Sequence, residues 1–451
     1  MRKKIPLLLS GLAVLILLAV GLYFVPSIHG KIAARLYLLR DTLIYAIHPP
    51  KELAFVPTQQ GLLATITGEP SDTPTSTPLP TDVATSTPTT TPLPSSDILS
   101  NVPFVGQCNR WNYCGPANLA MALQYWGWKG TPDDIATVIK PGENDTSLDF
   151  IQRGHSDVNV MPYEMVDYVN DNTPYRALYR YGGDLTLLKR MIAAGFPVIT
   201  ENGLVSRDSF TGNTAWSGHF AFATGYDDSQ QTITWQDSYG NLCVGDVSQI
   251  YKAGHNVPAK YSDYVGLWRD FDYVFIVVYP ADRETDVTAA LGPWADPNWA
   301  AQHALDMANQ DIQTLTGDDL FFAYFNKGTS LVALFRYGEA AQAYDYAYST
   351  VYPSLSNDTH LPFRIMWYQT GPYWAYYYTS RYQDVINLAD TNLTNRINPP
   401  ETLEESIYWR AMAEYQLGQV GAAVADIKKA YYYNKNMQAI QAAMQQWGVS
   451  P

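Results

Sequence analysis

The spacing of apolar and polar residues divides the chain into segments of different kinds. Ile5–Val25 is a run of 21 residues without a charged side chain, which is long enough to cross a membrane as a helix. Residues 70–97 instead hold Thr, Pro or Ser at 21 of 28 positions. Because such a segment buries too little apolar surface to offset its ordering entropy, it predicts a disordered stalk. Residues 31–69, between the two, predict a juxtamembrane segment.

The pattern changes again between residues 98 and 283. Leu119, Leu123 and Trp126 recur at the spacing of one buried helical face, on a helix that Cys114 opens. A loop-rich and helical middle follows, and then come runs typical of strands: Phe196–Thr200, His219–Tyr226, Thr232–Asp237 and Tyr273–Tyr279. A helix followed by a largely antiparallel sheet predicts an α+β domain.

The helical period returns over residues 290–451. Part of this segment resembles a tetratricopeptide repeat, at positions Gly328, Leu331, Tyr337, Ala340, Tyr344, Ala347 and Pro353. The pattern recurs around Val385 and Ala423, at intervals of 45 and 38 residues, whereas the usual repeat has about 34. We therefore expect an all-α domain of degenerate repeats, or repeats with insertions, whose groove suits a protein partner.

The N-terminus and the charge bear on location and partners. Arg2, Lys3 and Lys4 precede the apolar run, and no convincing small-residue cleavage site follows it. Residues 1–30 therefore predict a basic cytoplasmic tip and an uncleaved single-pass membrane anchor, with the C-terminal bulk extracellular. A cleaved signal peptide, giving a secreted form, is the alternative. The formal net charge of −14 argues against a nucleic-acid partner.

The three cysteines are too few for a disulfide framework. A single bridge between Cys108 and Cys243 stays open for an extracellular chain. Cys114 has a different setting, because Pro116 suits the first turn of the helix that begins there. Free backbone N–H groups and the helix dipole would stabilise a thiolate at that position. Cys114 is the candidate nucleophile.

A base and its orienting acid are predicted on one hairpin. His219 lies in an alternating strand, and the turn around Asp228 is followed by a second strand that ends in Asp237. A turn centred on Asp228 places Asp237 opposite His219, and every odd-length turn keeps the two on one face. Asp237 could then orient the imidazole. The amide of Gln107, seven residues before Cys114, could join the Cys114 backbone N–H in stabilising an oxyanion.

Each of these residues also has a plain structural interpretation. Cys114 could be an inert buried thiol, His219 a packing residue in a strand and Gln107 an ordinary surface residue. His155 and His255 lie in polar, turn-like contexts and are interpreted as structural. No residues have metal-ligand spacing and no glycine-rich phosphate loop occurs, so no metal or cofactor is expected.

A family resemblance connects these residues. The motifs that carry it are Gln107, Cys114–Met121, Gly218–His219, Thr224–Asp227 and Asp237. Over about residues 100–281 they resemble the papain-like cysteine peptidases related to bacteriocin leader-processing enzymes, the thirty-ninth family of cysteine peptidases. The resemblance implies Cys114 as nucleophile, His219 as base, Asp237 as orienter and Gln107 as oxyanion donor. Two features differ from the family pattern: the interval from Gln107 to Cys114 is seven rather than six, and Ser238 replaces a common proline.

The resulting prediction is a membrane-anchored extracellular cysteine peptidase that acts on a peptide or protein substrate. The helical repeats would recruit that substrate or a partner. Two alternatives stay open. One is an inactive papain-like binding or scaffold protein, and the other is a cell-wall amidase or acyl transferase that uses the same triad.

Overall fold

The structure is a computed structural model. It describes residues 55–58, 92–107, 112–141, 159–207, 214–239, 254–355, 362–394 and 403–451. The predicted transmembrane helix Ile5–Val25, and also Cys108, Cys243 and His155, lie outside these residues. None of the helices in the described part of the chain is long and apolar enough to cross a membrane.

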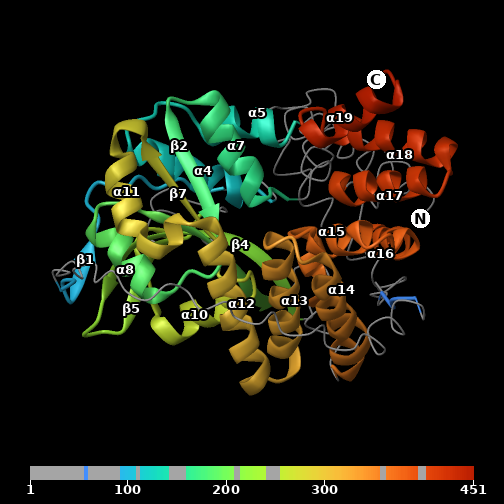
Figure 1. Cartoon of the computed structure of the whole chain (residues 1–451). Coiled ribbons are helices and arrows are strands. Elements are labelled where there is room, and N and C mark those ends of the chain that lie inside the picture. The colour runs from blue at the N-terminus through green and yellow to red at the C-terminus, as the bar shows by residue number, and fades with distance from the viewer. Residues whose placement is uncertain are drawn as a thin grey trace, which may run out of the picture.

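An antiparallel sheet forms the centre of the first half of the molecule (Figure 1). In the described residues it has seven strands in the order β2-β7-β3-β4-β5-β6, and β1 pairs with β4. The strands are β1 (Ser96–Ile98), β2 (Tyr175–Arg180), β3 (Val198–Arg207), β4 (Thr214–Asp227), β5 (Thr232–Gln236), β6 (Val257–Lys260) and β7 (Phe275–Pro280). The four predicted strands are therefore present, although β3 and β4 are longer than expected.

Helices cover both faces of this sheet. One face packs against α4 (Cys114–Tyr125), α5 (Pro132–Ile139) and α7 (Pro162–Asn172). The other packs against α8 (Leu185–Ala193), α10 (Tyr261–Arg269) and α11 (Glu284–Leu291). Because successive side chains of a strand point to opposite faces, Phe220 and Phe222 join the first core and Ala221 and Ala223 the second. The predicted α+β architecture is confirmed.

Three strands were not predicted, and one of them corrects the predicted stalk. Ser96–Ile98 pairs with Gly225–Asp227 of β4, so the last two residues of the segment 70–97 belong to the sheet. Pairing with a neighbour, rather than an apolar pattern, makes this short run a strand. The alternation of β2 is weak for a related reason: it is an edge strand, and Ala177 is its one fully buried residue.

The second half of the described chain is helical. After α12 (Pro297–Thr314) come three helix pairs and a last helix: α13 (Gly317–Ala333) with α14 (Tyr337–Tyr346), α15 (Gly371–Tyr378) with α16 (Tyr382–Thr394), α17 (Glu404–Gln416) with α18 (Val420–Tyr433), and α19 (Gln438–Trp447). The predicted helix pairs are confirmed.

The turns within the three pairs are equivalent. Phe335, Ser380 and Gly418 have φ values of 58°, 60° and 75°, and the next residue of each turn donates its N–H to a carbonyl five residues back. Their spacing of 45 and 38 residues equals the predicted intervals. The longer interval accommodates additional short helices, among them the 3₁₀ helix η5 (Pro362–Trp367).

One of the hydrophobic cores contains residues of both halves, although the sequence predicts separate domains at 98–283 and 290–451. Trp216 of β4 lies with its ring centroid 5.1 Å from that of Phe322 in α13 and 5.7 Å from that of Tyr368. Buried polar groups also cross the boundary, since the Ser330 hydroxyl donates to Asp272 at 2.7 Å. The helical half therefore completes the core beneath the end of β4.

Residues 55–58, which fall within the predicted juxtamembrane segment, pack on the helical half (Figure 1). Phe55 is buried, with its ring centroid 5.3 Å from that of Tyr348 and 5.8 Å from that of Tyr376. The backbone N–H of Thr58 donates to Asp384 at 2.8 Å. An aromatic side chain and a polar contact thus hold this piece on the α14–α16 helices.

Candidate active site

Cys114 lies where the start of α4 meets an open edge of β4. The pairing of β5 with β4 reaches Phe222 and Gln236. On the same edge, Asn118 of α4 donates its amide to the Phe220 carbonyl at 2.9 Å and to the Cys114 carbonyl at 2.9 Å. The Phe220 backbone N–H in turn donates to the Cys114 thiol. The start of α4 therefore takes the place of a strand partner on this edge of β4.

The structure brings Cys114, His219 and Asp237 together. His219 hydrogen-bonds the Cys114 side chain, and its Nε2 lies 3.0 Å from the Asp237 Oδ1. Since Asp237 takes Nε2, the remaining ring nitrogen, Nδ1, serves the thiol. Cys114 and His219 are buried, whereas the Asp237 side chain is partly exposed. The three side chains form the series that the sequence predicted.

These contacts outweigh the effect of burial on both titrating groups. Burial favours neutral His219, but the hydrogen bonds and charges of Asp237 and Cys114 raise the pKa of His219 to about 10. Burial would raise the pKa of Cys114, yet His219, the Phe220 N–H and the charge of Lys140 bring that pKa below its ordinary value. Both shifts favour a thiolate–imidazolium pair at neutral pH.

The hairpin register differs from the prediction although the contact is present. Asp227 pairs with Thr232, so the turn has four residues rather than a centre at Asp228. An even-length turn alone would put His219 and Asp237 on opposite faces. The pairing shifts by one residue at Thr224, between Ala223 and Gly225, and this β-bulge restores the shared face. Asp237 therefore contacts His219 diagonally rather than from the opposite position.

Gln107 is buried and connected to α4 through Ser238. Its backbone N–H donates to the Ser238 carbonyl at 2.9 Å, and its side-chain Oε1 accepts from the Ser238 hydroxyl at 3.0 Å. The Ser238 hydroxyl also accepts from Asn118 at 3.2 Å. Because Ser238 occupies the carbonyl oxygen of the Gln107 amide, the NH₂ end of that amide is turned away and can serve as a donor.

Two side chains beside this site were not predicted. Tyr368, from the helical half, accepts the Gly218 backbone N–H, and a Cβ on Gly218 would lie 2.7 Å from its ring. Phe271 would lie at 2.6 Å from the same Cβ, so the packing of two distant residues requires the glycine before His219. Glu201 of β3 is buried and interacts electrostatically with Cys114 and His219. The one sequence feature that could have identified Glu201 is the presence of a charged residue in an apolar strand. His255, interpreted as structural, packs edge-on against Phe104.

Comparison with known proteins agrees with this geometry. Residues 99–265 match the model of the Peptidase_C39 like family. This region is similar to C39-like peptidases. The C39-like region contains Cys114, His219 and Asp237, and its likeness suggests a cysteine peptidase.

Two further comparisons concern whole proteins. No curated protein matches the chain. A solved structure described as a C39-like peptidase from Bacillus anthracis is 19% identical, with a TM-score of 0.29, and the match covers 41% of this chain and 96% of that one.

Proposed function

We propose that the protein is a cysteine peptidase that hydrolyses peptide bonds through Cys114, His219 and Asp237. The observation that carries the proposal is the hydrogen-bonded series of these three side chains, in which a buried thiol has a lowered pKa. A structural buried thiol would have its pKa raised by desolvation. The likeness of residues 99–265 to C39-like peptidases supports the same reaction class.

In the acylation step the Cys114 thiolate attacks the carbonyl carbon of the scissile peptide bond. The oxyanion that forms accepts hydrogen bonds from the Cys114 backbone N–H and the Gln107 amide. The tetrahedral intermediate collapses with cleavage of the C–N bond. His219 gives its proton to the leaving amine, and a thioester remains on Cys114.

In the deacylation step His219, now neutral, takes a proton from water. The resulting hydroxide equivalent attacks the thioester, and the acid product leaves as the thiolate–imidazolium pair re-forms. Asp237 stabilises the protonated ring and fixes its orientation in both steps. Each step uses groups that are hydrogen-bonded before substrate arrives.

The proposal includes the surroundings of the enzyme. An N-terminal helix over Ile5–Val25 would anchor the protein in the cell membrane, with the peptidase outside, and the helical half would recruit a substrate or partner. Fractionation of the full chain, followed by protease treatment of intact cells, tests this arrangement. Recovery in the soluble cytoplasmic fraction would contradict it.

The chemical test is labelling with iodoacetamide at neutral pH, together with hydrolysis of a quenched fluorogenic peptide library. The wild type is compared with Cys114→Ala and His219→Ala. We expect rapid labelling at Cys114, slower labelling in His219→Ala, and hydrolysis by the wild type alone. A Cys114 that reacts no faster than free cysteine would leave the inactive scaffold as the better interpretation. Transfer of the acyl group to an added amine in preference to water would instead identify an acyl transferase.

A further inference from the structure

A large cavity separates the C39-like region from the helical half. Its volume is about 990 Å³, and its walls come from α7, β2 and β3 on one side and from α13, α15 and α17 on the other. Glu201 and Tyr368, which both interact electrostatically with Cys114, line it. The cavity therefore extends from the neighbourhood of the nucleophile towards the helices.

Glu201 is an unusual residue for this wall. It is 1% exposed, and neither carboxylate oxygen has a hydrogen-bond partner among the residues that the structure describes. Burial raises the pKa of Glu201 well above its ordinary value, and the negative charge of Cys114 raises it further, while His219 lowers it. A buried carboxyl group without a partner destabilises a fold. A purely structural role offers no reason to keep one beside the active site.

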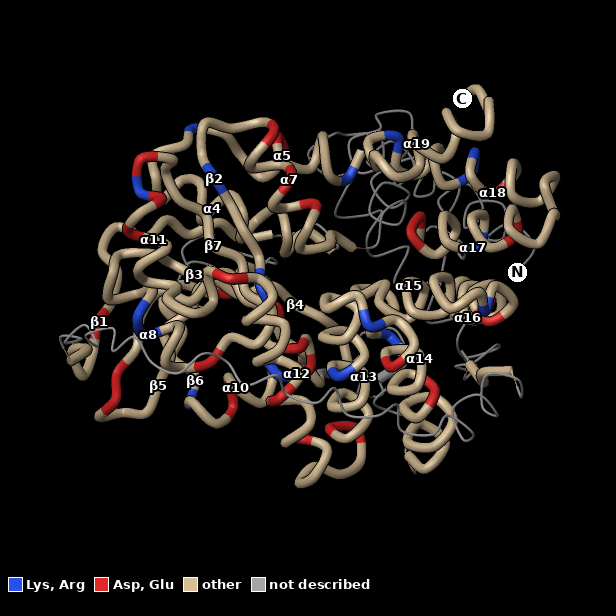
Figure 2. The backbone as a smooth tube through the Cα atoms, in the orientation of Figure 1, with Lys and Arg blue, Asp and Glu red and all other residues tan. Residues whose placement is uncertain are grey.

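Other acidic residues line the same cavity. Glu164, Asp167 and Asp171 come from α7 and Glu405 from α17, whereas Arg180 is the one basic residue among the described residues of the wall. Figure 2 shows the acidic positions on α7 and at the start of α17. A cavity lined mostly by one sign of charge, with low-dielectric walls, concentrates ligands of the opposite sign.

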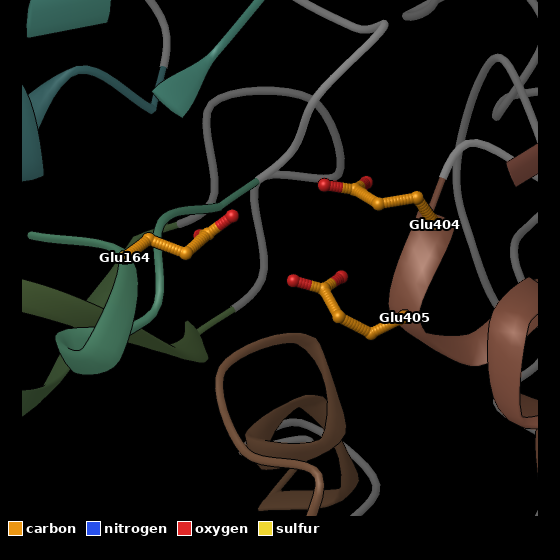
Figure 3. A group of neighbouring side chains, drawn as sticks. All are labelled: Glu164, Glu404 and Glu405. Carbon is orange, nitrogen blue, oxygen red and sulfur yellow. The ribbon is translucent and has the colours of Figure 1, made fainter. Parts of the chain in front are cut away.

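Two of these carboxylates, on Glu164 and Glu405, approach a third, on Glu404, at the boundary between the halves. Figure 3 shows Glu164 directed towards Glu404 and Glu405, and their oxygen atoms lie within 4.8 Å. Asn434 donates its amide to Glu164 at 3.3 Å and to Glu404 at 3.1 Å. The Asn434 amide therefore satisfies part of the hydrogen-bonding capacity of this cluster. We assign the cluster a supporting role, in which it adds negative potential to the cavity, and we do not assign it as the binding site.

The remaining wall favours an organic cation over a metal ion. Aromatic rings supply much of it, among them Tyr179, Tyr181, Tyr368, Tyr408 and Trp409. Such rings attract ammonium and guanidinium groups and pack against their aliphatic stems. Calcium instead needs six to eight oxygen ligands, which a single carboxyl group among aromatic rings does not provide.

We propose that this cavity binds an ammonium or guanidinium group of the substrate, and that Glu201 is the residue that recognises it. The peptidase would then prefer peptides with a Lys or Arg side chain that reaches Glu201. This inference rests on the proposed function and names its substrate class. On binding, Glu201 releases its proton to solvent, and the carboxylate accepts a charge-assisted hydrogen bond from the cation. Charge and protons therefore balance without any further reactant.

The first experiment compares matched quenched peptides in which one position at a time holds Lys or norleucine. The two side chains differ essentially in the ammonium group. For the wild type we expect kcat/KM at one position to favour Lys by about 10- to 100-fold. In Glu201→Gln the ratio falls towards one. Glu339→Gln is the control, because Glu339 is an exposed acid on α14 that pairs with Arg336. Its ratio should match the wild type.

The second experiment does not need catalysis or a Glu201 variant. Full-length Cys114→Ala is titrated by calorimetry with the preferred Lys peptide and its norleucine counterpart, in two buffers of different ionisation enthalpy. The Lys peptide should bind about 10-fold tighter or better and release up to one proton. Equal affinities without proton release would overturn the inference, even if Glu201→Gln failed to fold.

The two proposals fail in different ways. If Cys114 labels rapidly and peptides are hydrolysed, but Lys gives no advantage at any position, the inference on Glu201 is wrong and the peptidase stands. If Cys114 is unreactive while Cys114→Ala still prefers the Lys peptide, the peptidase is wrong and the cation site stands. A Lys preference that persists in Glu201→Gln would assign recognition to another acid of the wall.

Discussion

Two neighbouring pairs on β3 and β4 show how differently buried polar groups can be treated in one sheet. Asn202 lies opposite His219, and Glu201 lies opposite Phe220. His219 has hydrogen bonds to Cys114 and Asp237. The Glu201 carboxyl group, in the next pair, has no hydrogen bond to any side chain or backbone group in the described part of the chain. Both side chains are buried and both interact with the same thiol.

The difference separates chemistry from recognition. A group that must hold or move a proton benefits from partners that fix its orientation before substrate binds. A group that must accept a ligand has to keep its hydrogen-bonding capacity open, at a cost in stability. The His219 side therefore resembles a preorganised catalytic site, and the Glu201 side resembles an empty binding site.

The largest effect on peptide hydrolysis should come from removal of the Cys114 thiol, the proposed nucleophile. Cys114→Ala should lower peptide hydrolysis by about 10⁴-fold or more, since the members of such a unit act together. Thermal unfolding should change little, because Ala fills most of the same buried site. Measurable hydrolysis above a few per cent of the wild type would show that the chemistry lies elsewhere.

Asp237→Asn should have the next largest effect. The Asp237 carboxylate raises the pKa of His219 to about 10, so a neutral amide should lower that pKa. Hydrolysis needs the protonated ring to supply the leaving amine, so the alkaline limb of the pH–rate profile should move to lower pH. The rate should fall by about 10²- to 10⁴-fold. An unchanged alkaline limb would mean that Asp237 does not act through His219.

Ser238→Ala should have a smaller effect on the rate. Loss of the hydroxyl leaves the Gln107 amide free to rotate, and we expect about a 10-fold fall in kcat with little change in KM. Gln107→Ala provides the comparison. If Ser238 acts through Gln107, the double variant should be no slower than Gln107→Ala, whereas additive losses would show independent roles.

The smallest expected effect is on thermal stability, and it comes from the buried Glu201 carboxyl group. In the unfolded chain Glu201 ionises above its ordinary pKa of 4.5, whereas burial keeps it protonated in the fold. Stability is therefore lost as pH rises above about 4.5 towards the folded pKa. Glu201→Gln removes this penalty. Its Tm should match the wild type near pH 4.5 and exceed it by about 2–4 °C at pH 8. If the Tm of Glu201→Gln at pH 8 is instead lower than that of the wild type, the ionised Glu201 carboxylate is stabilised by a partner in the folded protein.

The sequence contained enough to predict that Cys114, His219 and Asp237 lie together, because the signals for them are local. A cysteine that opens a helix and a histidine in an alternating strand are visible within short windows. The register of the hairpin was not predictable from turn position alone. A four-residue turn and a bulge at Thr224 each shift the register by one residue. The two shifts together keep His219 and Asp237 on the same face of the sheet. The predicted contact between His219 and Asp237 therefore depends on a bulge that the local sequence pattern did not predict.

The unpredicted parts of the site depend on distant packing. Glu201 stands in an apolar strand, and the adjoining space is a cavity only because the helical half, which contributes Tyr368, forms its other wall. The helix pairs themselves were predictable, since Phe335, Ser380 and Gly418 mark equivalent turns. Their fusion with the sheet through Trp216 was not, because a periodic pattern shows that a face is buried but not against what.

The packing of Phe55 has a mechanical consequence. In the described residues the chain first meets the folded body at Phe55, on α14–α16, and meets it again at β1 on the far side of the sheet. Phe55 and β1 are thus held at two separate places on one folded body. A force applied to the chain ahead of Phe55 would therefore act first on the helices and leave α4, which carries Cys114, out of the line of force.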